Sequence, residues 1–512
     1  MKAVIAVPPV SDFYFTPHRA AHLGAHTALS AVKSLGFDTE IVLPGSKTGK
    51  AELPENLYYI VKNILPGEFG PISYFTEYLR FGRHWKTVAE RVLQAVPDIV
   101  LLSSFAFAYA EDAIQTAREL KKIRPELPIF ACGAGASVFP EYYLQSGLFT
   151  AVLAGEAETV LPEFLPAFSK DTRDISRIPG VFTLNNIQQT QGIAAKQTTA
   201  KEIIPMWSQT YSTRRMRHIS FTYSRGCNKQ CSFCANRLCH GNGLRTASIE
   251  SISAAIKEIP TDLPLRINLE DDNLLADKDT FFTVLKLLKK HCNSVSFTAE
   301  NGIDYTLMDK NTIDHLVDAG FYKFNFSLVS KNSTLLQRMH RYGSTETLTT
   351  LCNRLLELEI PVITYFICGF PGDTKENIIN TLDFLMDIPS DIGISLFYPV
   401  PGIPGFGSRN QFPPGSAVLC TGAAAYPWSG DLTTMEMVTA FRLARFCNLL
   451  KKSAPNEIEE RIIRRSLRER TLITSVKIQD NTRLIQVPNL SVGLVEQFFA
   501  TVVKKWEAHR SK

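Results

Sequence analysis

Three cysteines stand within eight residues of one another, at Cys227, Cys231 and Cys234. Their spacing suits a 4Fe–4S cluster, which is normally held by cysteine thiolates. Such a cluster usually takes four thiolates, so a compact set of three leaves one iron open to a substrate or cofactor. A zinc site is the alternative, with Cys239 and His240 as the spare ligands nearby, although zinc generally takes four closed ligands in paired spacings.

The same three cysteines, with the aromatic Phe233 ahead of the last one, resemble the signature of the radical S-adenosylmethionine (radical SAM) enzymes. The resemblance implies a 4Fe–4S cluster on Cys227, Cys231 and Cys234, with SAM chelating the fourth iron through its amino and carboxylate groups. It also implies that one electron cleaves SAM to methionine and a 5'-deoxyadenosyl radical. Cys239 lies outside the triad, and we expect it to be structural.

After the cysteine loop, short β-rich runs alternate with amphipathic helical segments, which predicts a parallel βα architecture. Six strands match the partial (βα)6 barrel that the radical SAM resemblance implies. Because function in parallel barrels gathers at the carboxyl ends of strands, the residues that follow each strand are the candidates for binding. The predicted strands are 218–223, 265–269, 294–299, 323–327, 361–367 and 391–397.

The resemblance covers about residues 216–405 and implies SAM contacts at the strand ends. Val329 is a departure, since it stands where the family often has the Glu of a Ser-Leu-Glu-Ser stretch. For any one of these segments, a helix cap or a turn is the alternative interpretation. The candidate SAM-binding residues are Phe233, Glu270, Asp271, Asp272, Asn273, Glu300, Asn301, Ser327, Ser330, Ile367, Gly369 and Tyr398.

Residues 1–167 also alternate strands and helices, which predicts a doubly wound, Rossmann-like α/β sheet with ligands outside its strand carboxyl ends. The loops with small residues resemble those of the cobalamin-binding domain that precedes many radical SAM enzymes. Alternatives are a domain that has lost its cofactor and one that binds a nucleotide, although no G-x-G-x-x-G follows the first strand. The implied cobalamin contacts are Pro8, Pro9, Ser103, Ser104, Phe105, Gly133, Ala134, Gly135, Gly155 and Glu156.

Three histidines, His18, His22 and His26, recur every four residues in a predicted helix over 18–35, which places them on one helix face. A metal or cobalt ligand is one interpretation, and packing or surface exposure is the commoner one. The cobalt-ligating motif D-x-H-x-x-G is not matched around His22, where alanines stand at the Asp and Gly positions. We therefore expect cobalamin without a histidine ligand from the protein.

Composition excludes several other functions. The net charge is only +5 and the positive residues are dispersed, so nucleic-acid binding is not expected. No apolar run approaches the roughly 20 residues that span a bilayer, and the start of the chain is too short for a signal peptide. The other cysteines are scattered among apolar segments, as is typical of reduced thiols. We expect a cytoplasmic protein without membrane contact.

These patterns predict four parts: a cobalamin-binding domain (1–167), a linker without chemistry (168–215), a radical SAM partial barrel (216–405) and a mostly helical region that closes the active site (406–512). The resemblance implies a cobalamin-dependent radical SAM methyltransferase. It would methylate an unactivated carbon or phosphorus of a small molecule or peptide, with a flavodoxin or ferredoxin as electron donor. Alternatives are a radical SAM oxidase, cyclase or ring-contracting enzyme that uses cobalamin differently or not at all, and a non-catalytic sensor that binds cluster and corrin.

Overall fold

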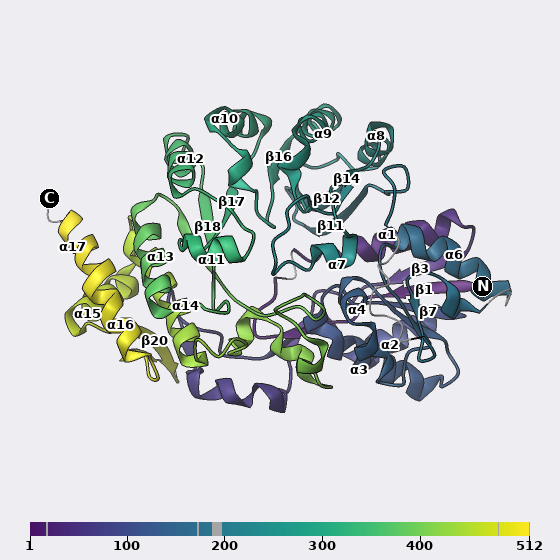
Figure 1. The fold of residues 1–512 in the computed structure, drawn as a ribbon, viewed down its shortest axis with the longest axis horizontal. Coiled ribbons are helices and arrows are strands. Elements are labelled where there is room, and N and C mark those ends of the chain that lie inside the picture. Colours follow the sequence, from purple (N-terminus) through teal and green to yellow (C-terminus); the bar gives the residue numbers. More distant parts are fainter. Residues whose placement is uncertain (17–18, 171–173, 187–196, 480, 511–512) are drawn as a thin grey trace.

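The computed structural model describes residues 1–16, 19–170, 174–186, 197–479 and 481–510. Two α/β parts lie side by side (Figure 1), one built largely from the purple and blue amino-terminal residues and the other an arc of teal and green elements. The yellow carboxyl-terminal elements lie at the end of the molecule opposite the amino terminus. None of the helices among the described residues combines the length and apolar character that a membrane span needs.

The amino-terminal part is a doubly wound sheet, as predicted. Five of its strands, β1, β3, β7, β8 and β9, run parallel, and the edge strand β10 is antiparallel to β9. The spatial order is β10-β9-β8-β7-β1-β3, so the winding reverses between β1 and β7, where such sheets place their ligand crevice. The strands are β1 (Lys2–Ala6), β3 (Asp38–Val42), β7 (Ile99–Ser103), β8 (Ile129–Cys132), β9 (Ala151–Leu153) and β10 (Val181–Phe182).

Side-chain alternation along these strands builds a core on each face of the sheet. Ala3 and Ile5 of β1 pack with α1 (Leu23–Ser34) and α6 (Ala157–Lys170). Val4 and Ala6 pack in the opposite core, with α2 (Trp85–Gln94) and α3 (Ala110–Ile123). Both faces of the sheet are therefore buried, which explains why its strands are nearly continuous apolar runs.

The second part is the predicted partial barrel of six parallel strands, each within two residues of its predicted bounds. Two groups of three, β12-β15-β16 and β17-β18-β19, are joined by parallel bridges at Phe297 and Ile303. The helices lie outside the strands (Figure 1). The strands are β12 (Arg217–Thr222), β15 (Leu265–Leu269), β16 (Val295–Thr298), β17 (Phe324–Val329), β18 (Val362–Cys368) and β19 (Asp391–Leu396).

The long barrel helices begin at side-chain caps, each of which satisfies an N–H group of the first turn. Ser248 caps α8 (Ile249–Lys257) and Asp277 caps α9 (Lys278–His291). Later caps are Asp309 for α10 (Lys310–Ala319), Ser344 for α12 (Thr345–Glu357) and Thr374 for α13 (Lys375–Asp387). These caps fix where each helix leaves its strand-end loop.

The segment 168–215 is more ordered than the sequence indicates. Residues Met206–Ser212 form β11, an antiparallel edge strand on β12. One side of this edge strand faces water, so the strand contains polar residues and lacks the apolar run that predicted the other strands. Residues 171–173 and 187–196 of this segment lie outside the described residues.

The carboxyl-terminal region contains the predicted helices but also an unpredicted hairpin. The helices are α14 (Thr434–Lys451), α15 (Glu457–Glu469), α16 (Val492–Phe498) and α17 (Lys504–Arg510). The hairpin, β20 (Ile473–Ile478) and β21 (Asn481–Gln486), pairs with β5 (Glu68–Phe69) of the amino-terminal half.

Residues 55–78 pack with the barrel and this carboxyl-terminal region. Leu57 and Ile60 share the barrel core, and the buried guanidinium of Arg442 binds both carboxylate oxygens of Glu68. Residues 55–78 of the amino-terminal half thus contact the carboxyl-terminal region directly.

Candidate active site

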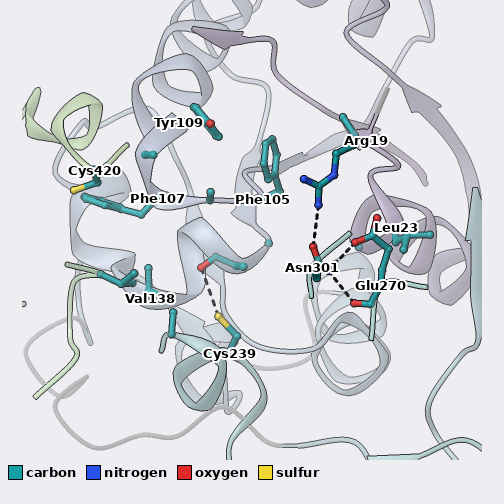
Figure 2. A pocket seen from close by; sticks show the side chains of 18 of the residues that line it. Arg19, Leu23, Phe105, Phe107, Tyr109, Val138, Cys239, Glu270, Asn301 and Cys420 are labelled. Carbon is teal, nitrogen blue, oxygen red and sulfur yellow. Dashed lines mark hydrogen bonds between the residues drawn. The ribbon is translucent and has the colours of Figure 1, made fainter. Parts of the chain in front are cut away.

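A cavity of about 1400 Å³ lies between the strand ends of the amino-terminal sheet and the mouth of the barrel. Ser103 and Gly155 line it from the first part, and Glu270 and Asn301 line it from the barrel. In Figure 2, Arg19 reaches from the amino-terminal part to Asn301, which in turn contacts Glu270. The two sets of parallel strand ends therefore open into one shared space.

The cysteine loop follows β12, and its thiols have polar and charged neighbours. The Nδ2 atom of Asn273 lies 3.7 Å from Cys227 Sγ. Burial raises the pKa of Cys231, an effect that the charge of Arg341 opposes, and burial raises the pKa of Cys234 to about 11. Iron would therefore have to displace the thiol protons on binding.

The donor set fits a multi-iron cluster better than a single ion. Among the described residues, no three His, Cys, Asp or Glu side chains converge on one metal position. A 4Fe–4S cluster does not require such convergence, because each thiolate binds a different iron atom. The spare zinc ligands are engaged elsewhere: His240 Nδ1 lies 2.9 Å from Glu156 Oε1, and Cys239 Sγ lies 4.0 Å from Ala134 O.

Two contacts fix the ends of the cysteine loop. At its start, Asp271 Oδ1 accepts hydrogen bonds from the backbone N–H groups of Tyr223 (3.0 Å) and Ser224 (2.6 Å). At its end, the ring of Phe233 packs 5.2 Å from that of Phe370. Burial raises the pKa of Asp271, and these hydrogen bonds oppose that rise. Asp271 thus orders the loop backbone.

The structure brings only some of the candidate SAM-binding residues to the cavity. Glu300 lies outside its lining and binds Lys323 Nζ at 2.6 Å. Ser330 is buried and accepts a hydrogen bond from Asn332 N. The candidates that line the cavity are Phe233, Glu270, Asp271, Asp272, Asn301, Ile367 and Tyr398, and those outside the lining are Asn273, Glu300, Ser327, Ser330 and Gly369.

The candidate cobalamin contacts divide in the same way. Two glycines serve the packing of one loop against another, because an added Cβ would lie 2.5 Å from Ser104 O at Gly133 and 2.5 Å from Ala106 C at Gly135. Close backbone packing, more than ligand approach, therefore requires glycine at these positions. Ser103, Phe105, Gly133, Ala134, Gly155 and Glu156 line the cavity, whereas Pro8, Pro9, Ser104 and Gly135 do not.

The predicted histidine face is wrong, because α1 begins at Leu23. His22 precedes the helix with a φ of 50°, His26 lies in the first turn, and His18 lies outside the described residues. His22 lines the cavity, and burial lowers its pKa to about 4, so this imidazole is neutral near pH 7.

Sequence reasoning missed a set of small residues at and just before the start of α1 that faces the cavity. An added Cβ at Gly24 would meet nothing within 4 Å. The helical spacing of Ala and Gly was the available signal. These residues leave room for a bulky planar group such as a corrin; they are Ala20, Ala21, Gly24, Ala25 and Ala28.

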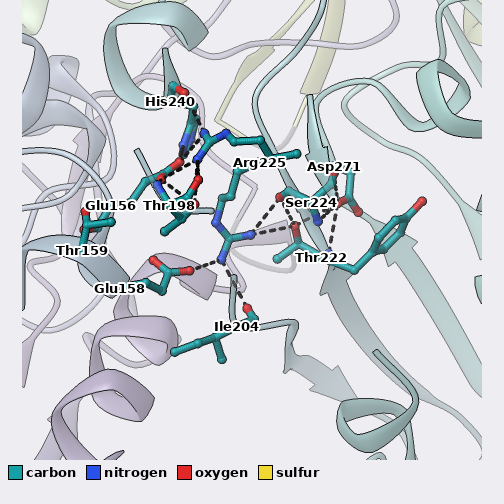
Figure 3. Close-up of polar contacts among 12 residues, drawn as sticks. Glu156, Glu158, Thr159, Thr198, Ile204, Thr222, Ser224, Arg225, His240 and Asp271 are labelled. Carbon is teal, nitrogen blue, oxygen red and sulfur yellow. Dashed lines mark hydrogen bonds and ion pairs between the residues drawn. The ribbon is translucent and has the colours of Figure 1, made fainter. Parts of the chain in front are cut away.

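Two glutamates and two arginines clasp the amino-terminal sheet to the cysteine loop (Figure 3). Arg225 and Arg245 are paired neighbours in the hairpin of β13 (Ser224–Arg225) and β14 (Arg245–Thr246). Arg245 binds Glu156, and Arg225 Nη2 lies 2.9 Å from Glu158 Oε1. Arg225 precedes Cys227 by two residues. The clasp therefore joins the cysteine loop directly to the segment that follows β9.

Glu156 is the centre of this clasp and is only 4% exposed. Besides Arg245 it binds His240, and it accepts hydrogen bonds from both N and Oγ1 of Thr198. Burial alone would raise the pKa of Glu156, but these partners hold it well below its usual range. Its oxygens are thus occupied by protein groups, and Thr198 gives the supposed linker a structural role.

Comparison with known proteins identifies both parts of the chain. Residues 221–385 match the model of the radical SAM superfamily, and residues 73–165 match that of the B12 binding domain. An uncharacterized methyltransferase of Pyrococcus horikoshii is 21% identical over 62% of this chain and 70% of its own length. The hopanoid C-3 methylase of Methylococcus capsulatus is 27% identical over 32% of each chain.

Two solved structures share the fold. TsrM, a radical SAM methyltransferase from Kitasatospora setae, gives a TM-score of 0.54 at 16% identity and covers 77% of this chain and 73% of its own. OxsB, a cobalamin-dependent SAM radical enzyme, gives 0.52 at 13% identity over 75% of this chain and 52% of its own. The thiol triad, the strand-end cavity and the small residues around α1 fit the groups that these two domains hold. The chain therefore joins a B12 binding domain to a radical SAM domain, and it is a radical SAM enzyme with a 4Fe–4S cluster, SAM and cobalamin as its cofactors.

Proposed function

We propose that this enzyme transfers a methyl group to an unactivated carbon, or to phosphorus, of a small molecule or peptide. The observation that carries the proposal is the single cavity shared by the strand ends of the amino-terminal sheet and the barrel mouth. When bound, the cluster and SAM supply a 5'-deoxyadenosyl radical that abstracts a substrate hydrogen atom, and methylcobalamin supplies the methyl group. Methyltransferase names among the relatives, including a cytidylyl-2-hydroxyethylphosphonate methyltransferase of Streptomyces wedmorensis, support this reaction class.

We assign the cofactors to the parts as the sequence predicts. Cys227, Cys231 and Cys234 hold the cluster, residues 216–405 bind SAM, residues 1–167 bind cobalamin, and residues 406–512 close the cavity. The cavity-lining members of the two candidate sets are the proposed contacts. Glu156 is removed from the corrin contacts, since Arg245, His240 and Thr198 already occupy its carboxylate.

The work of the protein in this scheme is placement. Asp271 holds the start of the cluster loop, and Phe233 holds its end. The Glu156–Arg245 and Glu158–Arg225 pairs fix the spacing between the loop and the amino-terminal sheet. Aromatic side chains such as Phe105 and Phe107 line the cavity and give it an apolar wall.

The test begins with metal content of protein purified without oxygen from cells supplied with cobalamin. The proposal predicts about one cobalt and about four irons per chain. With a reductant in place of the proposed flavodoxin or ferredoxin, turnover should yield S-adenosylhomocysteine together with 5'-deoxyadenosine. Four irons without cobalt would contradict the proposal. Cobalt with 5'-deoxyadenosine alone would favour the oxidase, cyclase or ring-contraction alternative, and neither product would favour a sensor.

A further inference from the structure

One wall of the cavity is left over after the cluster, SAM and corrin candidates are placed. It consists of Tyr14, Phe75, Phe441 and Arg445, and all four residues line the cavity. The rings form a continuous row, with centroids 5.3 Å apart from Tyr14 to Phe75 and 5.4 Å apart from Phe75 to Phe441. Arg445 Cζ lies 5.5 Å from the Phe441 ring centroid. We call these four residues the arginine wall.

The arginine wall reaches solvent at Tyr14. Ile392, near the start of β19, also lines the cavity, whereas the cysteine loop follows the end of β12. Tyr14 is 60% exposed, so this end of the cavity is open. A molecule in solvent can therefore reach this wall.

Two arginines one turn apart on α14 have different surroundings. Arg442 is fully buried and binds both oxygens of Glu68. Arg445 is half-buried, and its Nη1 donates a hydrogen bond to Ser73 O at 2.5 Å. Within the part of the chain that the structure describes, no carboxylate pairs with Arg445, and the nearby Glu68 is already bound to Arg442.

Arg445 therefore has N–H donors for a ligand. Guanidinium carries five N–H groups in a planar fork that matches carboxylate or phosphate oxygens. Burial and the charge of Arg442 both lower the pKa of Arg445, which marks an environment that an anion would stabilise. The neighbouring Asn448 is not available, because its amide binds both N and O of Ile392 on the edge of β19.

We propose that the arginine wall binds the anionic group, a carboxylate or a phosphate, of a methyl acceptor with an apolar or aromatic body. The assignment to the acceptor rests on the proposed function, while anion binding by Arg445 does not. The rings of Phe75 and Phe441 contact the apolar body, and Arg445 binds its charged end. The anion thereby sets which end of the acceptor faces the cofactors.

The test measures binding directly, by calorimetry on the reconstituted holoenzyme saturated with S-adenosylhomocysteine so that the SAM site is occupied. Benzoate, phenyl phosphate and the neutral benzyl alcohol are the probes. At least one anion should bind the natural protein more tightly than benzyl alcohol. Arg445→Gln, which removes the charge but can still donate to Ser73 O, should weaken that anion by about 10- to 100-fold and leave benzyl alcohol unchanged.

Two further variants separate ligand binding from folding. Arg445→Lys restores the charge without the planar fork and should recover part of the lost affinity, which a purely structural role would not predict. Arg464→Gln makes the same change on the exposed face of α15 and should leave anion binding unaltered. Equal anion affinity of the natural protein and Arg445→Gln, or no preference of the natural protein for either anion, would overturn the proposal. The probe that loses more affinity identifies the anionic group.

Cobalt content and S-adenosylhomocysteine formation report on the proposed function independently. If cobalt were absent while Arg445 still governed anion binding, the methyltransferase assignment would fail and the anion site would stand. If S-adenosylhomocysteine and 5'-deoxyadenosine both formed but Arg445→Gln left anion affinity unchanged, only the present inference would fail.

Discussion

The guanidinium of Arg245 donates to both carboxylate oxygens of Glu156, at 2.9 Å to Oε2 and 2.7 Å to Oε1. Glu156 lies in the loop that follows strand β9 of the amino-terminal sheet. Arg245 lies in β14, which pairs with β13 beside the cysteine loop. One bidentate pair thus joins the two cofactor domains. Its side chains are almost completely buried, so the cost of breaking it is high.

Glu156→Gln should lower the free energy of unfolding by about 3–5 kcal/mol, because it leaves the buried charge of Arg245 without its partner. The matched control is Glu460→Gln, which breaks an exposed pair with Arg464 on α15 and should cost about 0.5 kcal/mol or less. Urea unfolding measures both values. Similar losses in the two variants would show that the clasp does not hold the domains together.

The same carboxylate gives a pH dependence. Because the folded-state pKa of Glu156 lies below the ordinary value of 4.5, its stabilising contribution is present above that pH and is lost as the pH falls below it. The thermal midpoint of the natural protein should therefore fall more steeply below pH 4.5 than that of Glu156→Gln. Parallel curves for the two proteins would argue against this depressed pKa.

The pKa of Asp12 is shifted in the opposite direction, so its effect on stability has the opposite pH dependence. Burial raises its pKa from 3.8 to about 7, although Phe13 N, Tyr109 and Thr421 donate hydrogen bonds to it. Its folded-state pKa is raised, so stability is lost as the pH rises from about 3.8 to 7, up to about 4 kcal/mol. Asp12→Asn should raise the thermal midpoint at pH 8 much more than at pH 5.

The control for this prediction is Asp318→Asn, at an exposed position of α10, which should change the midpoint little at either pH. An Asp12→Asn variant less stable than the natural protein at pH 8 would contradict the predicted sign. It would indicate that the ionised carboxylate is favoured at this place in the cavity.

Cluster binding should depend on the triad and not on the fourth cysteine nearby. Each of Cys227→Ala, Cys231→Ala and Cys234→Ala should lose most of its iron after anaerobic reconstitution. Cys239→Ala should keep about four irons, because Cys239 lies outside the triad and its Sγ lies 4.0 Å from Ala134 O. Iron analysis and the visible absorption of the cluster measure the outcome. Iron loss in Cys239→Ala would assign that thiol to the cluster.

Gly24 offers a test of where the corrin lies. Gly24→Phe places a ring in the open space before α1, and cobalt content should fall from about one per chain to near zero. Gly493 holds the same second position in α16 and also has nothing within 4 Å of an added Cβ, so Gly493→Phe is the matched control. Both variants should fold, because each substitution removes a glycine, a residue that disfavours helices. Full cobalt in Gly24→Phe would place the corrin elsewhere.

Much of the fold is predictable from local patterns. Short β-rich runs located the parallel strands of the barrel, and β15 occupies the predicted range 265–269. The edge strand Met206–Ser212 and the hairpin Ile473–Gln486 escaped prediction. Strands of this kind are stabilised by pairing with a distant neighbour, and their own sequences carry a weak signal.

The sequence by itself determined the chemistry, because three thiolates spaced as Cys227, Cys231 and Cys234 must lie in one short loop whatever the rest of the chain does. Tertiary structure alone decided the roles of isolated side chains. In the sequence, Glu156 has the position of a strand-end ligand, but in the structure Arg245 binds its carboxylate. Arg442 and Arg445 look alike in the sequence, but Glu68 pairs only with Arg442. The physical reason is that a charge is free or bound according to partners hundreds of residues away, and only the fold brings those partners within hydrogen-bond distance.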